Sequence, residues 1–114
     1  MQQAKNLFIT YSPIYLDWQL WDGHPTNPIR AKLATELLQK QLGDKATVID
    51  PAPREQRAND IAILHQLHDP QYVELTLQGE NREWSGVRKE VAEAGLAMFG
   101  GTVRAVELIL NGEA

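Results

Sequence analysis

The sequence predicts a helix-rich α/β domain that opens with a strand, a helix and a second strand. Two short runs, 7–11 and 46–50, consist largely of apolar and strand-forming residues. The segment between them carries apolar residues at helical spacing, and the chain after position 58 shows the same helical spacing. A strand–helix–strand unit of this kind indicates a parallel strand pair joined by a right-handed crossover. At 114 residues, we expect 1–114 to form a single domain.

The first predicted strand, Leu7–Tyr11, is followed by an aromatic segment. Ser12-Pro13 ends the strand, and Ile14–Asp22 has no clear period, so we interpret it as an ordered loop with room for one helical turn. Its two tryptophans, Trp18 and Trp21, need cover because each can bury ~150–250 Å². They either pack on the sheet edge or line the mouth of a pocket.

The first predicted helix, Ala31–Leu42, has well-defined start and stop signals. Asn27 suits the N-cap, Pro28 suits the first helical position, and Gly43 suits the left-handed residue after the helix. We expect its core-facing stripe to comprise Ile29, Leu33, Leu37, Leu38 and Leu42. The second predicted strand is Ala46–Asp50.

Three further helices are predicted after a polar loop at Pro51–Ala58. Asn59 is expected to cap the first of them, which carries Ile61, Leu64 and Leu67. Asp69-Pro70 starts the second, which Gly79 ends, and 80–86 is a polar connection. The third spans Val87–Leu110. Gly100-Gly101 within it indicates either close contact with a neighbouring backbone or a break into two helices, and we favour one helix with a tight contact at the glycines.

The composition excludes several classes of function. The net charge is −4, and the longest cationic run is the pair Arg88-Lys89, so we expect no nucleic-acid partner. There is no cysteine, Met1–Asn6 lacks the apolar core of a signal peptide, and no apolar run has the ~20 residues that a bilayer requires. We therefore expect a cytoplasmic protein without a membrane partner.

The residues alone present no complete active site. Asp22-Gly23-His24 has the spacing of an Asp-x-His metal pair, but two ligands do not make a zinc site, so we predict no metal site here. We interpret His65 and His68 as solvated or capping residues. Neither Gly-x-Ser-x-Gly nor a phosphate-binding glycine loop is present.

Several motifs together resemble a known family. They are Tyr11-Ser12-Pro13 with Tyr15, then Gly23-His24-Pro25-x-x-Pro28-x-Arg30, His68-Asp69-Pro70-Gln71-Tyr72-Val73, and Gly100-Gly101-Thr102-Val103-Arg104-Ala105 with Leu110-Asn111-Gly112. In this order they are similar to the N-terminal part of the histone deacetylase superfamily, and the bacterial acetoin-utilisation-type members look closest.

The resemblance implies the N-terminal part of an arginase-like three-layer α/β fold and, for a complete member, zinc-dependent amide hydrolysis of acetylated lysine or similar amines. The family's paired histidines and its Asp/His/Asp zinc ligands follow the glycine-pair helix, beyond Ala114. We therefore expect an incomplete deacetylase-like domain that holds no zinc, has no catalytic residue and is inactive by itself.

The same resemblance carries over one candidate site. Arg30, with Gly23, His24 and Pro25, matches the family's substrate or product channel, where a guanidinium suits a carboxylate product. Alternatively, Arg30 is a structural donor to the carbonyls of its own loop. The alternative function for the whole chain is a non-catalytic interaction module. Under either hypothesis, we expect self-association through exposed apolar helix faces.

Overall fold

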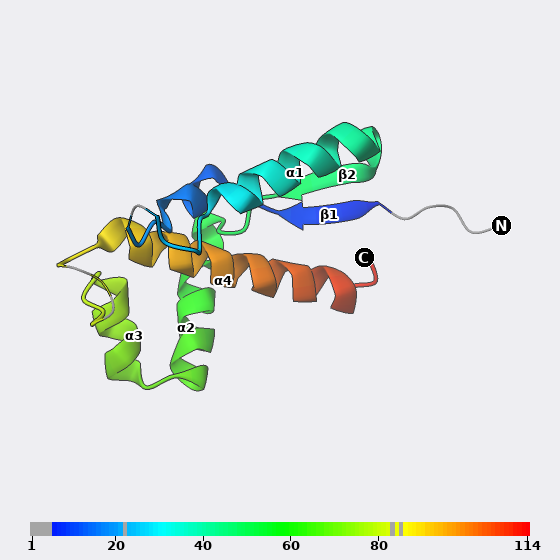
Figure 1. Cartoon of the computed structure of the whole chain (residues 1–114). Coiled ribbons are helices and arrows are strands. Elements are labelled where there is room, and N and C mark those ends of the chain that lie inside the picture. Colours follow the sequence, from blue (N-terminus) through cyan, green and yellow to red (C-terminus); the bar gives the residue numbers. More distant parts are fainter. Residues whose placement is uncertain (1–5, 22, 83, 85) are drawn as a thin grey trace.

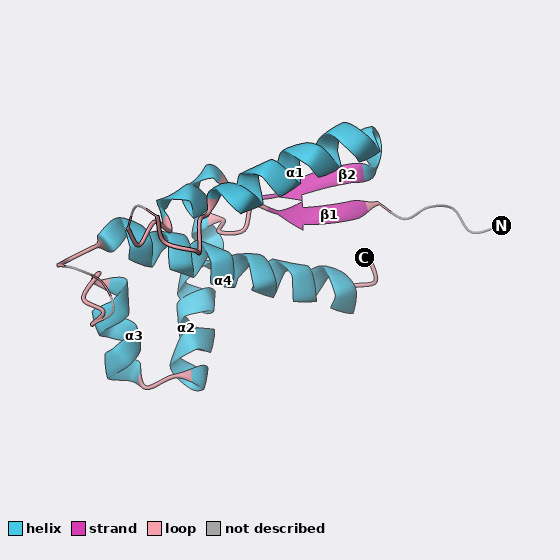
Figure 2. Ribbon diagram, in the orientation of Figure 1, coloured by secondary structure: helices cyan, strands magenta, loops and turns pink. Residues whose placement is uncertain are grey.

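The described residues form a helix-rich α/β fold with a two-stranded parallel sheet and four α-helices (Figures 1 and 2). The computed structural model describes residues 6–21, 23–82, 84 and 86–114. Of the segment Met1–Asn6, in which we predict no signal peptide, only Asn6 is among the described residues. The elements, in chain order, are β1 (Leu7–Thr10), the 3-10 helix η1 (Pro13–Asp17), α1 (Ile29–Leu42), η2 (Gly43–Lys45), β2 (Ala46–Ile49), η3 (Arg54–Gln56), α2 (Arg57–Leu67), α3 (Pro70–Leu77) and α4 (Lys89–Leu110).

The two strands pair in parallel, which confirms the predicted strand–helix–strand unit. Their register runs from Leu7 opposite Ala46 to Thr10 opposite Ile49, and the Tyr11 N–H extends the ladder by donating to the Ile49 carbonyl at 3.2 Å. α1 packs against β2 and α4 against β1, so the strands lie between these two helices (Figure 1).

α4 is the helix around which the remaining elements gather. It contacts η1, β1, α2 and α3, and it runs along almost the whole length of the molecule in Figure 1. Most of the buried apolar side chains belong to it, namely Val91, Ala92, Ala94, Leu96 and Ala97. Small residues predominate in this set, and their size lets the neighbouring elements approach the helix backbone closely.

Two predicted helix features differ from the structure. α2 begins at Arg57, preceded by the 3-10 turn η3, so the predicted loop to Ala58 is too long and Asn59 is not an N-cap. With the helix starting at Arg57, Asp60 lies in its first turn, where it is 2% exposed and pairs with Arg104 of α4. Residues 57–59 are exposed, and Asp60 is the buried residue of this first turn.

The predicted core-facing stripe of α1 is wrong, because each of its five residues is at least 36% exposed. Thr35 is the buried residue, and its hydroxyl donates to the Ala31 carbonyl at 2.8 Å. Leu33 and Leu37, one turn apart on the other side, are 56% and 57% exposed. The prediction failed because helical spacing does not specify which apolar residues receive a partner when the sheet beneath is only two strands wide.

The fold leaves much apolar surface uncovered. Beyond α1, the large exposed apolar side chains include Val106, Ile109 and Leu110 at the end of α4. Across the described ranges, none of the helices combines the length and apolarity needed to span a membrane.

Candidate functional site

The predicted channel loop is an exposed turn that leads into α1. Gly23 adopts φ +79°, a left-handed conformation that favours glycine. The His24 Nδ1 accepts a hydrogen bond from the Thr26 N–H at 2.9 Å, and the His24 ring meets Trp21 edge to face at 4.2 Å. Pro25 is exposed. These contacts shape the turn locally, while Asp22, the other half of the Asp-x-His pair, lies outside the described residues.

Arg30 lies in the first turn of α1 with its side chain exposed. The predicted N-cap is displaced by one residue, since the helix begins at Ile29, whose N–H is accepted by the Asn27 side chain at 3.0 Å. Within the described part of the chain, the Arg30 guanidinium has no hydrogen-bond acceptor. No contact therefore supports its role in a substrate or product channel or its role as a donor to the carbonyls of its own loop. Both roles remain predictions.

The other two histidines lie at the C-terminal end of α2, His65 in its last turn and His68 as its C-cap. His65 Nε2 is 3.1 Å from the Glu74 carboxylate at a partly exposed position. His68 ends α2 through its backbone N–H, which donates to the Leu64 carbonyl at 2.9 Å. Asp69 caps α3 as predicted, because its carboxylate accepts from the backbone N–H groups of Gln71 and Tyr72.

The glycine pair of α4 forms a close junction with the N-terminal half of the chain, as predicted. A Cβ on Gly100 would collide with the carbonyl oxygen of Pro51, two residues after β2. A Cβ on Gly101 would collide with the Tyr15 hydroxyl and approach Thr10 Oγ1 to 2.9 Å. Only glycines allow α4 to approach both segments this closely.

An ion pair between Asp60 and Arg104 is buried beside the same junction. The Arg104 guanidinium donates to both carboxylate oxygens, at 2.9 and 2.7 Å, and lies 3.5 Å from the Pro51 carbonyl. The hydrogen bond with Asp60 raises the pKa of Arg104, although burial acts in the opposite direction. This bidentate geometry holds α2 against α4.

Tyr15 closes the junction on the side of η1. It is buried, and its ring meets Tyr11 edge to face at 5.6 Å. Burial raises the pKa of the Tyr15 hydroxyl, a hydrogen bond with Thr10 acts against this, and the charge of Asp50 adds to the rise. The neutral phenol is therefore the form that the junction favours.

The sequence interpretation overlooked Asp60 and its pairing with Arg104, although a signal for the pair exists. Asp60 precedes Leu64 and Leu67 at helical spacing, and Arg104 follows Gly100 at the same spacing. A single acid and a single base, each within the apolar stripe of a different helix, together predict a buried pair. The pattern of one helix alone does not indicate the buried pair.

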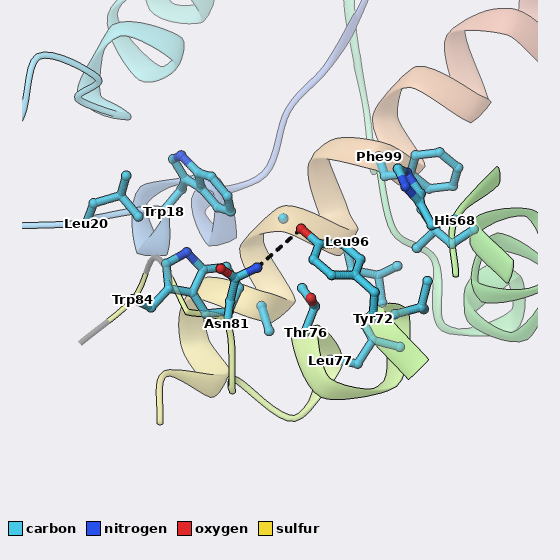
Figure 3. A pocket seen from close by; sticks show the side chains of 14 residues that line it. Trp18, Leu20, His68, Tyr72, Thr76, Leu77, Asn81, Trp84, Leu96 and Phe99 are labelled. Carbon is cyan, nitrogen blue, oxygen red and sulfur yellow. Dashed lines mark hydrogen bonds between the residues drawn. The ribbon is translucent and has the colours of Figure 1, made fainter. Parts of the chain in front are cut away.

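A cavity of about 370 Å³ opens between α2, α3, α4 and the segment after η1. Trp18 and Trp84 meet edge to face across one part of it at 6.2 Å, and Gly95 lies against the Trp18 ring. The pocket alternative therefore holds for Trp18, whereas Trp21 is exposed and contacts His24. Figure 3 shows Trp18 and Trp84 on one side of the cavity and His68 and Phe99 on the other.

Two further arginines, Arg57 and Arg88, link separate segments of the chain. Arg57 donates to both oxygens of Glu93, at 2.6 and 2.8 Å, and this contact lowers the pKa of Glu93 and raises that of Arg57. Arg88 ties the start of α4 to the carbonyls of Gln19 and Leu20, at 2.6 and 2.8 Å. Within 6–21, 23–82, 84 and 86–114, no three His, Asp or Glu side chains lie together as metal ligands.

Comparison with known proteins gives no relative of this chain: no family model, no curated protein and no solved structure matches it.

Proposed function

We propose that this chain is the N-terminal part of a deacetylase of the histone deacetylase superfamily, with an arginase-like fold. In the complete protein it supplies scaffold and one wall of a site that hydrolyses acetylated lysine or similar amines. The catalytic histidines and metal ligands belong to other parts of that protein. By itself the chain carries out no hydrolysis.

The observation that carries this proposal is the contact between motifs that lie far apart in the sequence. Tyr15 belongs to the first motif of the resemblance and Gly101 to the last, yet the Tyr15 hydroxyl lies against the Gly101 backbone. His68 and Tyr72, from the middle motif, line one cavity with Trp18, which lies just after the first motif. Motifs that resemble a family only by chance have no reason to pack on one another.

The narrow sheet also supports an incomplete domain. Parallel sheets occur almost entirely in α/β proteins whose sheets are covered on both faces, and isolated strand pairs have marginal stability. Here β1 and β2 pair only with each other among the described residues. Their outer edges offer unpaired backbone groups to further strands, and an arginase-like sheet supplies such strands.

The described residues do not assemble a site that would fit a zinc ion. Zinc needs three or four ligands, drawn here from His, Asp and Glu because the chain contains no cysteine. No such group of three exists in the described part of the chain. The proposal gives this chain a supporting role in the hydrolysis and assigns no catalytic step to its residues.

The proposal is tested by comparing the 114-residue chain with a longer chain expressed from the same coding sequence past Ala114. We expect the longer sequence to contain Gly-x-His-His and a later Asp-x-His, to bind one zinc per chain and to hydrolyse an acetyl-lysine peptide. Turnover of ~1 s⁻¹ or more is typical of enzymes. The 114-residue chain should show neither zinc nor turnover in the same assays.

Stoichiometric zinc with turnover in the 114-residue chain contradicts the proposal that this chain carries out no hydrolysis by itself. A longer chain that lacks both motifs and all hydrolysis contradicts the family assignment itself. Metal analysis by mass spectrometry and release of acetate are the two readouts, and chelator-treated longer chain is the negative control.

A second candidate function, a non-catalytic interaction module, is favoured by the outer face of α1. Leu33 and Leu37 lie one turn apart there, and both are more than half exposed. Paired exposed leucines on a helix are typical of a surface that meets another protein. A second copy of this chain is the partner that the proposal names.

Charging that face is expected to abolish self-association. We expect the wild-type chain to sediment as a dimer or larger species at ~100 μM, where an interface of micromolar affinity is populated. The double variant Leu33→Glu with Leu37→Glu should sediment as a monomer, because the carboxylates would lose solvation in the interface. The control, Gln39→Glu with Gln41→Glu, adds the same charge to α1 without removing an apolar side chain.

Sedimentation velocity across a concentration series decides the outcome. A monomeric wild-type chain, or equal dissociation by both double variants, contradicts the interface on α1. Circular dichroism of each variant shows whether its helices are intact.

A further inference from the structure

We infer that the cavity between α2, α3 and α4 is a binding site for a neutral, flat molecule of one or two fused rings. The inference is independent of the hydrolysis proposed above, because it uses only side chains of this chain. The volume of the cavity suits such a ligand. A benzene molecule occupies an apolar protein cavity of about 150 Å³, so about 370 Å³ has room for two fused rings.

The lining provides aromatic surfaces on more than one side. Trp18 and Trp84 stand edge to face at 6.2 Å, and Phe99 lies across the cavity from them (Figure 3). Aromatic side chains prefer offset or edge contacts with other rings, and each such pair adds to the free energy gained from area burial. A flat ring can make such contacts here with several partners at once.

The charge of the lining selects a neutral ligand. Among the described residues that line the cavity, none is Asp, Glu, Lys or Arg, and His68 is the one residue with a titratable nitrogen. An ionised ligand would lose its hydration without gaining a counter-charge, which is costly in an apolar site. The cavity therefore disfavours carboxylates and ammonium groups.

One polar position orients the ligand. The Tyr72 hydroxyl accepts a hydrogen bond from the Asn81 side-chain amide at 3.3 Å, and both residues line the cavity (Figure 3). The hydroxyl proton of Tyr72 has no acceptor among the described residues, so it can donate to an oxygen of the ligand. Ligand pockets typically combine an apolar lining with a few polar groups placed in this way.

Titration of the 114-residue chain with 2-naphthol and with 2-naphthoate tests this inference. The two probes share their rings, and only the second is charged. We expect 2-naphthol to bind with a Kd on the order of 100 μM, ordinary for a ligand of this size. We expect 2-naphthoate to bind at least about tenfold more weakly, because its carboxylate has no partner. Calorimetry gives the affinities, and shifts of the Trp18 and Trp84 indole signals in NMR give the location.

Variants separate the cavity from general surface binding. Thr76→Phe places a ring inside the cavity and should weaken 2-naphthol at least about tenfold, since the space is no longer available. Thr102→Phe, at an exposed position of α4 outside the cavity, is the matched control and should leave the affinity within about twofold. Tyr72→Phe, at a half-exposed position that tolerates change, should weaken 2-naphthol about two- to tenfold through the lost hydrogen bond.

Three results overturn the inference: no binding of 2-naphthol to the folded wild-type chain, equal affinity for 2-naphthoate, or equal effects of Thr76→Phe and Thr102→Phe. If Thr76→Phe fails to fold, the comparison of the two probes on the wild-type chain and the Tyr72→Phe variant still decide the question.

Discussion

Replacing Asp60 by alanine is expected to lower the free energy of unfolding by about 3–5 kcal/mol, the cost of leaving one charge of a buried pair without its partner. Arg104 is 6% exposed, and both of its bonds to Asp60 are shorter than 3.0 Å. Without the carboxylate, the guanidinium keeps only a 3.5 Å contact with the Pro51 carbonyl and another with Glu107 at the same distance. A domain with ~5–15 kcal/mol of stability would lose a large part of it.

A surface pair of the same geometry provides the control. Arg57 and Glu93 also form a bidentate pair, with bonds of 2.6 and 2.8 Å, but their side chains are 47% and 39% exposed. Glu93→Ala should therefore cost less than about 1 kcal/mol, because water replaces the lost contacts and screens the charge. The difference between the two costs then reports the effect of burial, since both pairs consist of two arginine–carboxylate hydrogen bonds.

Urea unfolding followed by far-ultraviolet circular dichroism measures both variants. Equal costs for Asp60→Ala and Glu93→Ala would show that the Asp60–Arg104 pair is hydrated and does not hold α2 on α4. The double variant Asp60→Leu with Arg104→Met removes both charges and should recover most of the loss, because an apolar pair of similar volume replaces a buried ion pair at little or no cost.

The sequence was sufficient to predict those elements whose signals are local. The parallel strand pair followed from two apolar runs that flank a helical segment, and α3 followed from Asp69-Pro70, whose carboxylate does cap the helix. The close approach of α4 at Gly100 was predicted because glycine is unfavourable inside a helix. A glycine pair there indicates a neighbouring segment that leaves no room for a side chain. In each case a nearby residue specifies the backbone directly.

Features that depend on distant partners could not be predicted in this way. The burial of Asp60 in α2 depends on Arg104, which lies on another helix, and the buried side of α1 depends on how wide the sheet is. The same limit applies to the candidate site. The loop around Arg30 was identified from a resemblance, and the exposed position of Arg30 offers no local contact that specifies its role.

Gly100→Ala is expected to destabilise the chain by about 2 kcal/mol or more, although alanine is the better helix former by ~1 kcal/mol. The new Cβ would collide with the Pro51 carbonyl oxygen and lie 3.1 Å from Asp60 Oδ2. A backbone carbonyl cannot rotate away as a side chain can, so either α4 or the 51–53 segment must shift.

Gly95→Ala, in the same helix, is the matched control. Its Cβ would lie 3.0 Å from Cζ3 of Trp18, a ring that borders the cavity and has space to move. The gain in helix propensity should then offset the contact, and we expect a net change within about 1 kcal/mol. The same urea series gives both values, and a Gly100→Ala chain as stable as the wild type would show that α4 does not rest on Pro51.

The background of Asp60→Leu with Arg104→Met separates the two causes of the Gly100→Ala cost. If contact with Pro51 dominates, the cost persists in that background, because the carbonyl oxygen is still in place. If the cost falls to near zero there, the added methyl group acts by displacing the Asp60 carboxylate from Arg104. Residues in mutual contact show coupling energies of about 0.5–3 kcal/mol, so this cycle can resolve the difference. We expect persistence, because the Pro51 oxygen is the atom nearest to the built Cβ.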